Sequence, residues 1–189
     1  MVKRVSHEAA VCPVARPMDC IGDGWSLLIV RDAFDGVRRF SEFEKSLGAA
    51  KNILAARLHH LVEHGIMEVV PASDGSRYQE YVLSEKGRAL FPVIVAIRQW
   101  GERYFFQPGE PYTQLVDRKR AKPLRQLKIQ SADGRIVGPD DTFVQKPNTQ
   151  ENLTQSRKGA KKKELPEPRS AGKKDSLVRR LPSGSARRL

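Results

Sequence analysis

The stretch KNILAARLHHLVEHG, residues 51–65, places the strongest constraint on the fold. Its large apolar residues recur at helical spacing, so a helix here carries one continuous apolar stripe. We expect Gly65 to end this helix, because glycine readily adopts the left-handed conformation of a helix C-terminus. A helix with one apolar stripe needs a core beneath it, which other elements must supply. The stripe consists of Leu54, Leu58, Leu61 and Val62.

A β-hairpin is expected directly after this helix. The segments IMEVV (66–70) and YQEYVL (78–83) have strand character and flank a turn-rich loop around Asp74-Gly75. Two such runs about a short polar loop predict an antiparallel pair.

Two short helices are expected within residues 12–34, with a break at Gly22-Asp23-Gly24. We expect Pro17 at the first position of the first helix and Asp23 as the N-cap of the second. A third short helix is expected in FSEFEKSLG, with Ser41 as its N-cap and Gly48 as its end.

The hairpin is followed by a last helical segment, residues 84–106, with Ser84 as its expected N-cap. Pro92 should kink or divide it, because proline lacks the backbone N–H that the helix needs. The apolar residues here exceed what a small domain buries alone, which favours a dimer face over ordinary core packing. They are Val93, Ile94, Ile97, Trp100, Tyr104 and Phe105.

The C-terminal part is expected to differ from the patterned region. Short alternating pieces with an Asp133-Gly134 turn predict a small β appendage over residues 111–147. Residues 148–189 are rich in Lys, Arg, Ser, Gly and Pro, and this composition predicts a disordered basic tail. The expected organisation is therefore an N-terminal arm (1–11), a folded domain (12–110), the appendage and the tail.

Charge and composition narrow the class of protein. The 189 residues carry a net charge of +12, which points to a polyanionic partner such as nucleic acid. Residues 148–189 hold 12 Lys/Arg against 4 Asp/Glu, a net charge of +8, which leaves +4 for residues 1–147. Basic charge alone thus does not make the folded part a DNA-binding domain.

No apolar run approaches the ~20 residues of a membrane span, and the N-terminus lacks the apolar region of a signal peptide. We therefore expect a cytoplasmic, nucleoid-associated protein without a membrane partner. The two cysteines are too few for a disulfide scaffold. No nucleophile–base pattern or nucleotide-binding loop occurs, so no enzyme and no cofactor are expected.

The order of these elements predicts a mainly α fold with a small β-hairpin, a winged helix-turn-helix, in which helix 51–64 reads the DNA major groove. With Leu58 at the core centre, Asn52, Ala56 and His60 fall near the opposite side. Asn52 can read adenine, Ala56 permits close approach, and Arg57 on the flank can reach guanine or phosphate. Such residues also occur on ordinary exposed helices, so this helix alone does not distinguish a DNA-binding surface from an ordinary one.

Further basic residues would contact DNA beside this helix. Arg38 and Arg39 could bind phosphates beside the groove, and Arg77 could enter the minor groove from the hairpin loop. Ser41 and Lys51 complete the expected DNA-binding set.

The chain resembles the HxlR-type winged helix-turn-helix transcriptional regulators, relatives of the MarR group, over residues 12–110. The motifs that carry the resemblance are CPVARPMDCIGDGWSLLIVRDAFDGVRRFSEFEKSLG, AKNILAARLHHLVEHGIMEVV, RYQEYVLSEKGRAL and WGERYF. It implies a homodimeric DNA-binding regulator whose recognition helix is 51–64 and whose wing is 71–77. It also implies a dimer formed through the first and last helices, near Val14, Ile21, Val93, Ile97, Trp100 and Tyr104.

The resemblance bears on metal and redox chemistry as well. Cys12 occupies a position at which some members sense oxidants, with Arg16 as its nearest cation; the alternative is an inert structural cysteine. A subset of the family carries a zinc-ribbon-like appendage, but residues 111–147 hold no cysteine, so we expect a metal-free remnant. A small-molecule or redox effector stays open.

Three functions follow as expectations. The first is a sequence-specific regulator, a repressor, that binds double-stranded DNA at a palindromic operator as a homodimer. The second is a nonspecific architectural DNA-binding protein driven by basic charge. The third is a winged-helix module that contacts protein instead of DNA.

Overall fold

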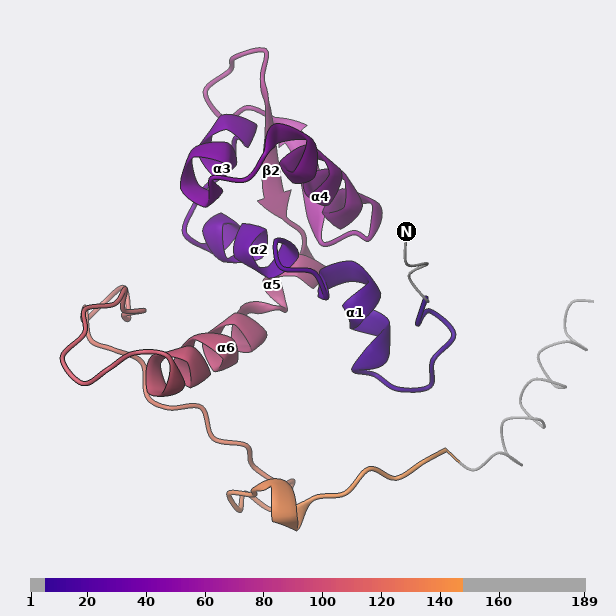
Figure 1. Cartoon of the computed structure of the whole chain (residues 1–189), viewed down its shortest axis with the longest axis vertical. Coiled ribbons are helices and arrows are strands. Elements are labelled where there is room, and N and C mark those ends of the chain that lie inside the picture. Colours follow the sequence, from indigo (N-terminus) through magenta and orange to yellow (C-terminus); the bar gives the residue numbers. More distant parts are fainter. Residues whose placement is uncertain (1–5, 148–189) are drawn as a thin grey trace, which may run out of the picture. The chain divides into compact units, whose positions relative to one another are not determined.

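The computed structural model describes residues 6–147 (Figure 1). The chain divides into two units, Met1–Ile136 and Val137–Leu189. The first unit confirms the predicted mainly helical fold with one two-stranded hairpin. Its elements are α1 (Ala15–Ile21), α2 (Ser26–Phe34), α3 (Phe40–Leu47), α4 (Lys51–Glu63), β1 (Met67–Pro71), β2 (Gln79–Leu83), α5 (Glu85–Arg88) and α6 (Phe91–Tyr104).

The core forms where α2, α3, α4 and the hairpin meet. The three leucines of the α4 stripe are buried and Val62 packs at their edge, as predicted. Burial of each leucine side chain stabilises the fold by about 2 kcal/mol. The largest fully buried side chains are Phe43, Ile29, Leu54, Leu58, Leu61 and Met67.

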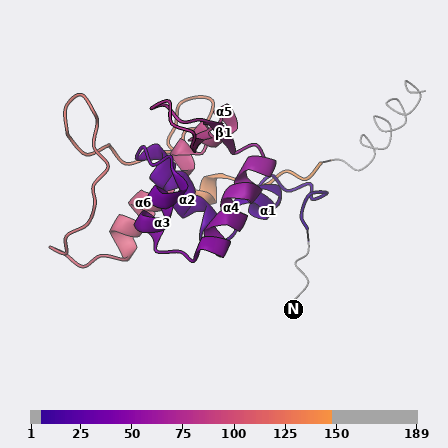
Figure 2. The same ribbon diagram turned by 90° about the horizontal axis from the view of Figure 1, so that it is seen from above.

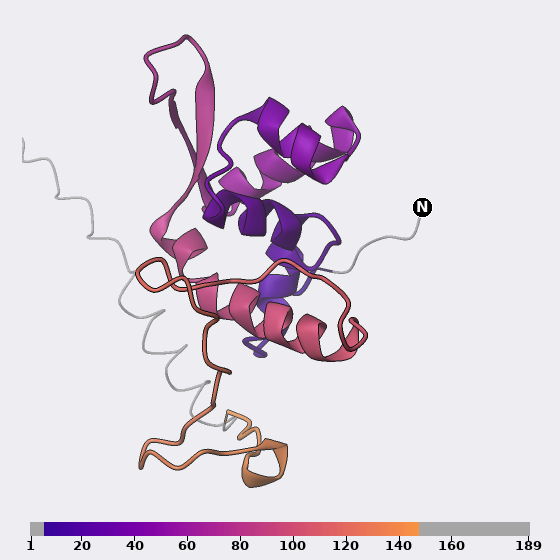
Figure 3. The ribbon, with the colours of Figure 1, turned by 90° about the vertical axis from the view of Figure 1, so that its left-hand side faces the viewer.

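The hairpin and α6 lie on opposite sides of the helices between them (Figure 3). Its strands pair antiparallel from Met67↔Leu83 to Pro71↔Gln79. Ser84 joins the hairpin to α5: its Oγ donates to the Gly65 carbonyl at 2.6 Å and accepts the N–H of Gly87 at 3.0 Å. The predicted N-cap is therefore confirmed.

Two helix starts differ from the sequence expectation. Helix α1 begins at Ala15, so Pro17 is its third residue and not its first. Helix α3 begins at Phe40, so Ser41 lies inside the helix and is not its N-cap. The Glu42 carboxylate takes the capping role, because its Oε2 accepts the backbone N–H groups of Arg38 at 3.0 Å and Arg39 at 2.9 Å. These bonds hold the pKa of Glu42 below its usual value.

Asp23 caps α2 from a position before the helix. Its Oδ1 accepts the N–H groups of Trp25 at 2.8 Å and Ser26 at 3.0 Å, and Trp25 is the residue at the N-cap. Pro92 divides the last helical segment, as predicted, because α5 ends at Arg88 and Pro92 lies in the first turn of α6.

The expected β appendage is wrong in its secondary structure. Beyond α6, the β structure of the described residues consists of two isolated bridges, Val116↔Pro123 and Gln130↔Ile136, without paired strands. Side chains of α6 hold this segment instead: Arg98 Nη1 donates to the Thr113 carbonyl at 2.7 Å. Alternating residues without a partner strand cannot form a sheet.

The second unit is described over residues 137–147 and contains one 3-10 turn, Pro139–Asp141. The predicted tail, residues 148–189, lies outside the described residues, as does the start of the N-terminal arm. Within 6–147, no helix has both the length and the apolar character needed to cross a membrane.

Candidate nucleic-acid interface

The outward face of α4 is exposed and combines a carboxamide, small side chains and an imidazole. Helix α4 follows α3 after a three-residue turn. Ala49 of this turn is buried and packs between the two helices. Such a face suits a DNA groove, because small residues permit close approach and an amide can pair with a base edge. Its exposed residues are Lys51, Asn52, Ile53, Ala55, Ala56, His59 and Glu63.

Three residues of the predicted DNA-binding set lie together on this face: Lys51, Asn52 and Ala56. The Lys51 ammonium lies 3.8 Å from a carboxylate oxygen of Glu44, an exposed pair that contributes little to stability. Ser41, also predicted, is exposed in the first turn of α3.

Two other predicted residues, Arg57 and His60, turn toward the protein. Arg57 Nε lies 3.5 Å from Asp23 Oδ1, and His60 Nε2 lies 2.9 Å from the Asp19 carbonyl oxygen. Figure 2 shows α1 beside α4; α1 covers the flank at His60, and Asp23 in the turn after α1 lies at Arg57. Helical spacing alone could not reveal it, because the covered flank depends on where α1 packs.

His59 takes the place on the outward face that spacing assigned to His60. Its side chain is 72% exposed, and its Nε2 lies 3.1 Å from Glu63 Oε1.

Arg38 and Arg39 join α3 to the hairpin. Arg39 Nη2 lies 2.5 Å from Asp74 Oδ2, and Arg38 Nη1 lies 3.5 Å from Glu80 Oε2. The Arg38 carbonyl also accepts the N–H of Tyr81 at 2.8 Å. The sequence assigned both arginines to phosphates, whereas the structure gives each an acidic partner within the protein.

Glu80 is the buried centre of this contact, with 3% of its surface exposed. Its Oε1 accepts the backbone N–H of Ser73 at 3.2 Å and the Ser73 hydroxyl at 3.0 Å. Burial raises the pKa of Glu80, but the bonds from Ser73 and Arg38 outweigh it and lower the pKa overall. Sequence reasoning missed Glu80; its signal is a charged residue at an inward position of a strand.

Asp74 stays ionised for a related reason. Hydrogen bonds from Arg39 and then from Ser76 hold the pKa of Asp74 well below its usual value, and the same bond raises the pKa of Arg39. We call the set Arg38, Arg39, Ser73, Asp74 and Glu80 the wing clamp. It fixes the hairpin loop relative to the start of α3.

Arg77 lies on the exposed hairpin loop, next to Tyr78, whose exposed fraction is 70%. Arg77 takes part in none of the ion pairs found within residues 6–147. Its guanidinium is therefore available to a phosphate or a minor groove.

The predicted dimer residues separate into two groups. Val93, Ile97, Trp100 and Tyr104 follow one another along α6 with exposed fractions of 41–61%, and Val14 is 67% exposed. Ile21 differs: it is only 5% exposed and belongs to the hydrophobic core. It is thus absent from the exposed apolar residues of the predicted dimer set, four of which lie on α6 and one, Val14, at the start of α1.

Cys12 is exposed, and Cys20 is partly buried against the core. Neither forms a disulfide within the described residues.

Comparison with known proteins agrees with this geometry. The family model of the HxlR-like helix-turn-helix matches residues 20–108. Mb3122 of Mycobacterium bovis, an uncharacterised HTH-type transcriptional regulator, is 41% identical over 114 residues, which is 60% of this chain and 72% of the relative. YdeP of Bacillus subtilis, another uncharacterised HTH-type transcriptional regulator, is 34% identical over 94 residues, 49% of this chain and 73% of the relative.

Two solved structures extend the similarity beyond α6. PA1607, solved as a candidate transcription factor, shares 60% identity with a TM-score of 0.72, over 76% of this chain and 100% of that one. PA1374 from Pseudomonas aeruginosa shares 39% identity with a TM-score of 0.51, over 77% of this chain and 99% of that one.

The fold and the outward face of α4 define a winged helix-turn-helix DNA-binding transcriptional regulator. Within that class, the chain belongs to the HxlR-like helix-turn-helix family.

Proposed function

We propose that the protein is a cytoplasmic homodimer that represses transcription by binding a palindromic operator. The observation that carries this proposal is the pairing of two exposed surfaces on one unit: the outward face of α4 and the apolar face of α6. A two-fold pair joined through α6 would present two copies of α4 to successive major grooves.

The residues divide by role. Asn52 and Ala56 would meet base edges, because the amide can pair with adenine and the methyl group can touch thymine. Lys51, Ser41 and Arg77 would contact the phosphate backbone or the minor groove. Arg57 would position α4 through Asp23.

The wing clamp would set the reach of Arg77, since it ties the hairpin loop to α3. Occupation of the operator would then exclude polymerase.

Selection from a random DNA pool at about 150 mM salt, near physiological ionic strength, tests the proposal. We expect a palindromic motif with half-sites about one helical turn apart. Asn52→Ala should weaken binding to that motif about tenfold or more and relax the base preference at one position of each half-site. Gln126→Ala removes an exposed carboxamide far from α4 and serves as the control.

A nonspecific architectural role is the second candidate, because residues 148–189 carry a net charge of +8. It predicts no motif, an unchanged affinity in Asn52→Ala, and retention on DNA that disappears as salt rises.

Oxidant sensing by Cys12 can be tested in the same assay. Cys12 is exposed, so a peroxide could reach it. If Cys12 is the sensor, peroxide changes the operator affinity of the wild type and leaves that of Cys12→Ser unchanged.

A further inference from the structure

A small hollow of about 260 Å³ lies between the turn after α2, strand β2, helix α5 and the chain that follows α6. It is smaller than the ~300–1,000 Å³ of sites that hold drug-sized ligands, so a small ligand fits it best. Its lining combines half-buried apolar side chains with three exposed arginines. The arginines are Arg38, Arg88 and Arg118.

The positive charge around this hollow has no acidic counterpart in the lining. None of the described residues that line it is an aspartate or a glutamate. Arg88 and Arg118 take part in no ion pair within residues 6–147. Arg38 has one, the 3.5 Å contact of its Nη1 with Glu80, which leaves its other guanidinium donors available. A hollow bordered by charges of one sign concentrates ions of the opposite sign, so this one favours an anion.

Two of the arginines are held by the winged helix-turn-helix itself. The carbonyl of Arg38 accepts the N–H of Tyr81 at 2.8 Å, which ties Arg38 to β2, and Tyr81 also lines the hollow. Arg88 is the last residue of α5, the short helix that Ser84 caps. Their positions therefore follow from the packing of the hairpin against the helices.

The third arginine, Arg118, lies in an ordered turn beyond α6. One of the two isolated bridges closes this turn. The Asp117 carboxylate accepts the backbone N–H groups of Lys119 at 3.3 Å and Arg120 at 3.1 Å. Asp117 thus stabilises the turn through its backbone, and the Arg118 guanidinium borders the hollow without a carboxylate partner.

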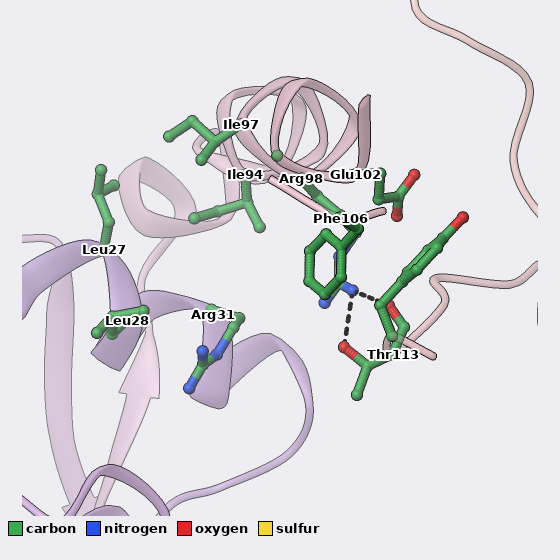
Figure 4. A pocket seen from close by; sticks show the side chains of 11 residues that line it. Leu27, Leu28, Arg31, Ile94, Ile97, Arg98, Glu102, Phe106 and Thr113 are labelled. Carbon is green, nitrogen blue, oxygen red and sulfur yellow. Dashed lines mark hydrogen bonds between the residues drawn. The ribbon is translucent and has the colours of Figure 1, made fainter. Parts of the chain in front are cut away.

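Side chains of α6 anchor the segment that carries this turn. Arg98 Nη1 donates to the Thr113 carbonyl at 2.7 Å and to the Thr113 hydroxyl at 3.3 Å, as Figure 4 shows. Gln99 Nε2 donates to the Arg125 carbonyl at 3.0 Å, and Gln99 Oε1 accepts the Leu127 N–H at 2.8 Å. These bonds lie on both sides of the turn along the chain, so they restrain its position.

We infer that this hollow binds a phosphate group through Arg38, Arg88 and Arg118. Guanidinium groups suit phosphate, because their planar N–H donors can meet two of its oxygens at once. A bound phosphate would link the winged helix-turn-helix to a segment beyond the residues that the family model matches. The inference is independent of the proposed function, since the described lining includes no residue of α4 or α6.

Arginine labelling of the full chain with phenylglyoxal, followed by mass spectrometry, tests the site with pyrophosphate as the probe at constant ionic strength. Pyrophosphate should slow the labelling of Arg88 and Arg118 several-fold and leave that of Arg120 unchanged. Arg120 is the internal control, because it is exposed in the same turn as Arg118 but does not line the hollow. Free phosphates and a DNA backbone share this chemistry, so a second arm replaces pyrophosphate by a short DNA duplex.

Calorimetry on two variants measures the affinity for the probe that protects. Arg118→Gln should weaken binding at least about tenfold, since it removes charge-assisted hydrogen bonds. Arg120→Gln removes the same charge from the same turn and should leave the affinity unchanged. Both arginines are exposed, so neither substitution disturbs the core.

Protection of Arg88 and Arg118 by pyrophosphate would support a small phosphate as the ligand, and protection by the duplex alone would assign the phosphate to DNA. Three results would overturn the inference: no protection in either arm, equal protection of Arg120, or equal affinities of Arg118→Gln and Arg120→Gln.

Discussion

At the scale of single residues, an arginine near the hairpin can either stabilise the fold or contact DNA. The presence of a neighbouring carboxylate distinguishes the two cases. Arg39 has an ion pair with Asp74 of the hairpin loop. Arg77, which lies on the same loop as Asp74, has no ion pair within the described residues. A guanidinium has five N–H donors, so the ion pair restrains Arg39 without using all of them. Removing the Asp74 carboxylate would leave Arg39 with only its longer ion pair, to Glu80 at 3.8 Å.

We predict that Asp74→Asn raises DNA affinity at low salt. Arg39 would lose its shorter ion pair and keep only the longer one with Glu80 at 3.8 Å, so its guanidinium would become more available to a phosphate, and a negative charge on the loop would vanish. The slope of log K against log salt should steepen by about 1, measured by fluorescence anisotropy over a salt series. Asp133→Asn is the control, because Asp133 also pairs with an arginine, Arg135 at 2.7 Å, but lies far along the chain from the hairpin. An unchanged slope in Asp74→Asn would show that Arg39 does not reach DNA.

Asp23 gives a prediction for pH. Partial burial alone would raise the pKa of Asp23. Hydrogen bonds from Ser26 and Trp25 and the charge of Arg57 outweigh burial, so the pKa lies below its usual value. A carboxyl with a lowered folded-state pKa stabilises the fold above its unfolded-state pKa, and this contribution is lost as pH falls through the folded-state pKa.

Asp23→Asn should therefore lower the free energy of unfolding by about 1 kcal/mol at neutral pH, because the cap of α2 and the pair with Arg57 both weaken. The difference from the wild type should stay constant between about pH 5 and 8 and shrink below about pH 4. Urea unfolding at several pH values measures it. A difference that grew toward acid pH would contradict this account of Asp23.

At the scale of the elements, periodicity was enough for the helices and the hairpin but not for their contacts. The stripe of α4, the turn at Gly65 and the division at Pro92 are local properties, and each is as predicted. Sequence spacing does not predict two of these contacts. Glu42, and not Ser41, accepts the backbone N–H at the start of α3. His60 lies against Asp19 of α1, and the packing of α1 cannot be read from the spacing within α4.

The segment beyond α6 also shows what could not be predicted from the sequence. Its alternation predicted strands, yet strands need partners, and the described residues form only isolated bridges there. Its order comes from Arg98 and Gln99 on α6, which bind its backbone directly. A local sequence pattern does not predict that polar side chains of a helix will bind the backbone of a later segment.

The exposed apolar face of α6 leads to a prediction on assembly. Trp100 is 56% exposed and contacts the rings of Tyr104 and Phe105, and buried tryptophans commonly dominate the energy of an interface. Trp100→Ala should raise the dissociation constant of the dimer at least about tenfold, measured by sedimentation velocity over a dilution series. Tyr78→Ala removes an exposed ring from the hairpin loop and should leave the dimer intact. A monomeric wild type would exclude the dimer altogether.

At the scale of the whole molecule, charge and recognition are carried by different parts of the chain. Residues 1–147 contain the α4 face and a net charge of +4, while residues 148–189 hold +8. Charge gives affinity for any DNA, and base contacts give preference for one sequence. The two properties should therefore be separable by shortening the chain.

We predict that residues 1–147 select the same operator motif as the full chain but bind it more weakly at low salt. Each lost phosphate contact reduces the salt slope by about 0.9, so a reduction of about 2 or more would mean that several of the 12 basic residues in 148–189 meet DNA. The two proteins should converge in affinity as salt rises, because the screened contribution disappears first. Loss of the motif on shortening would place part of the specificity in residues 148–189 and would require a reader other than α4. An unchanged slope would instead separate those residues from DNA binding and leave their charge to another partner.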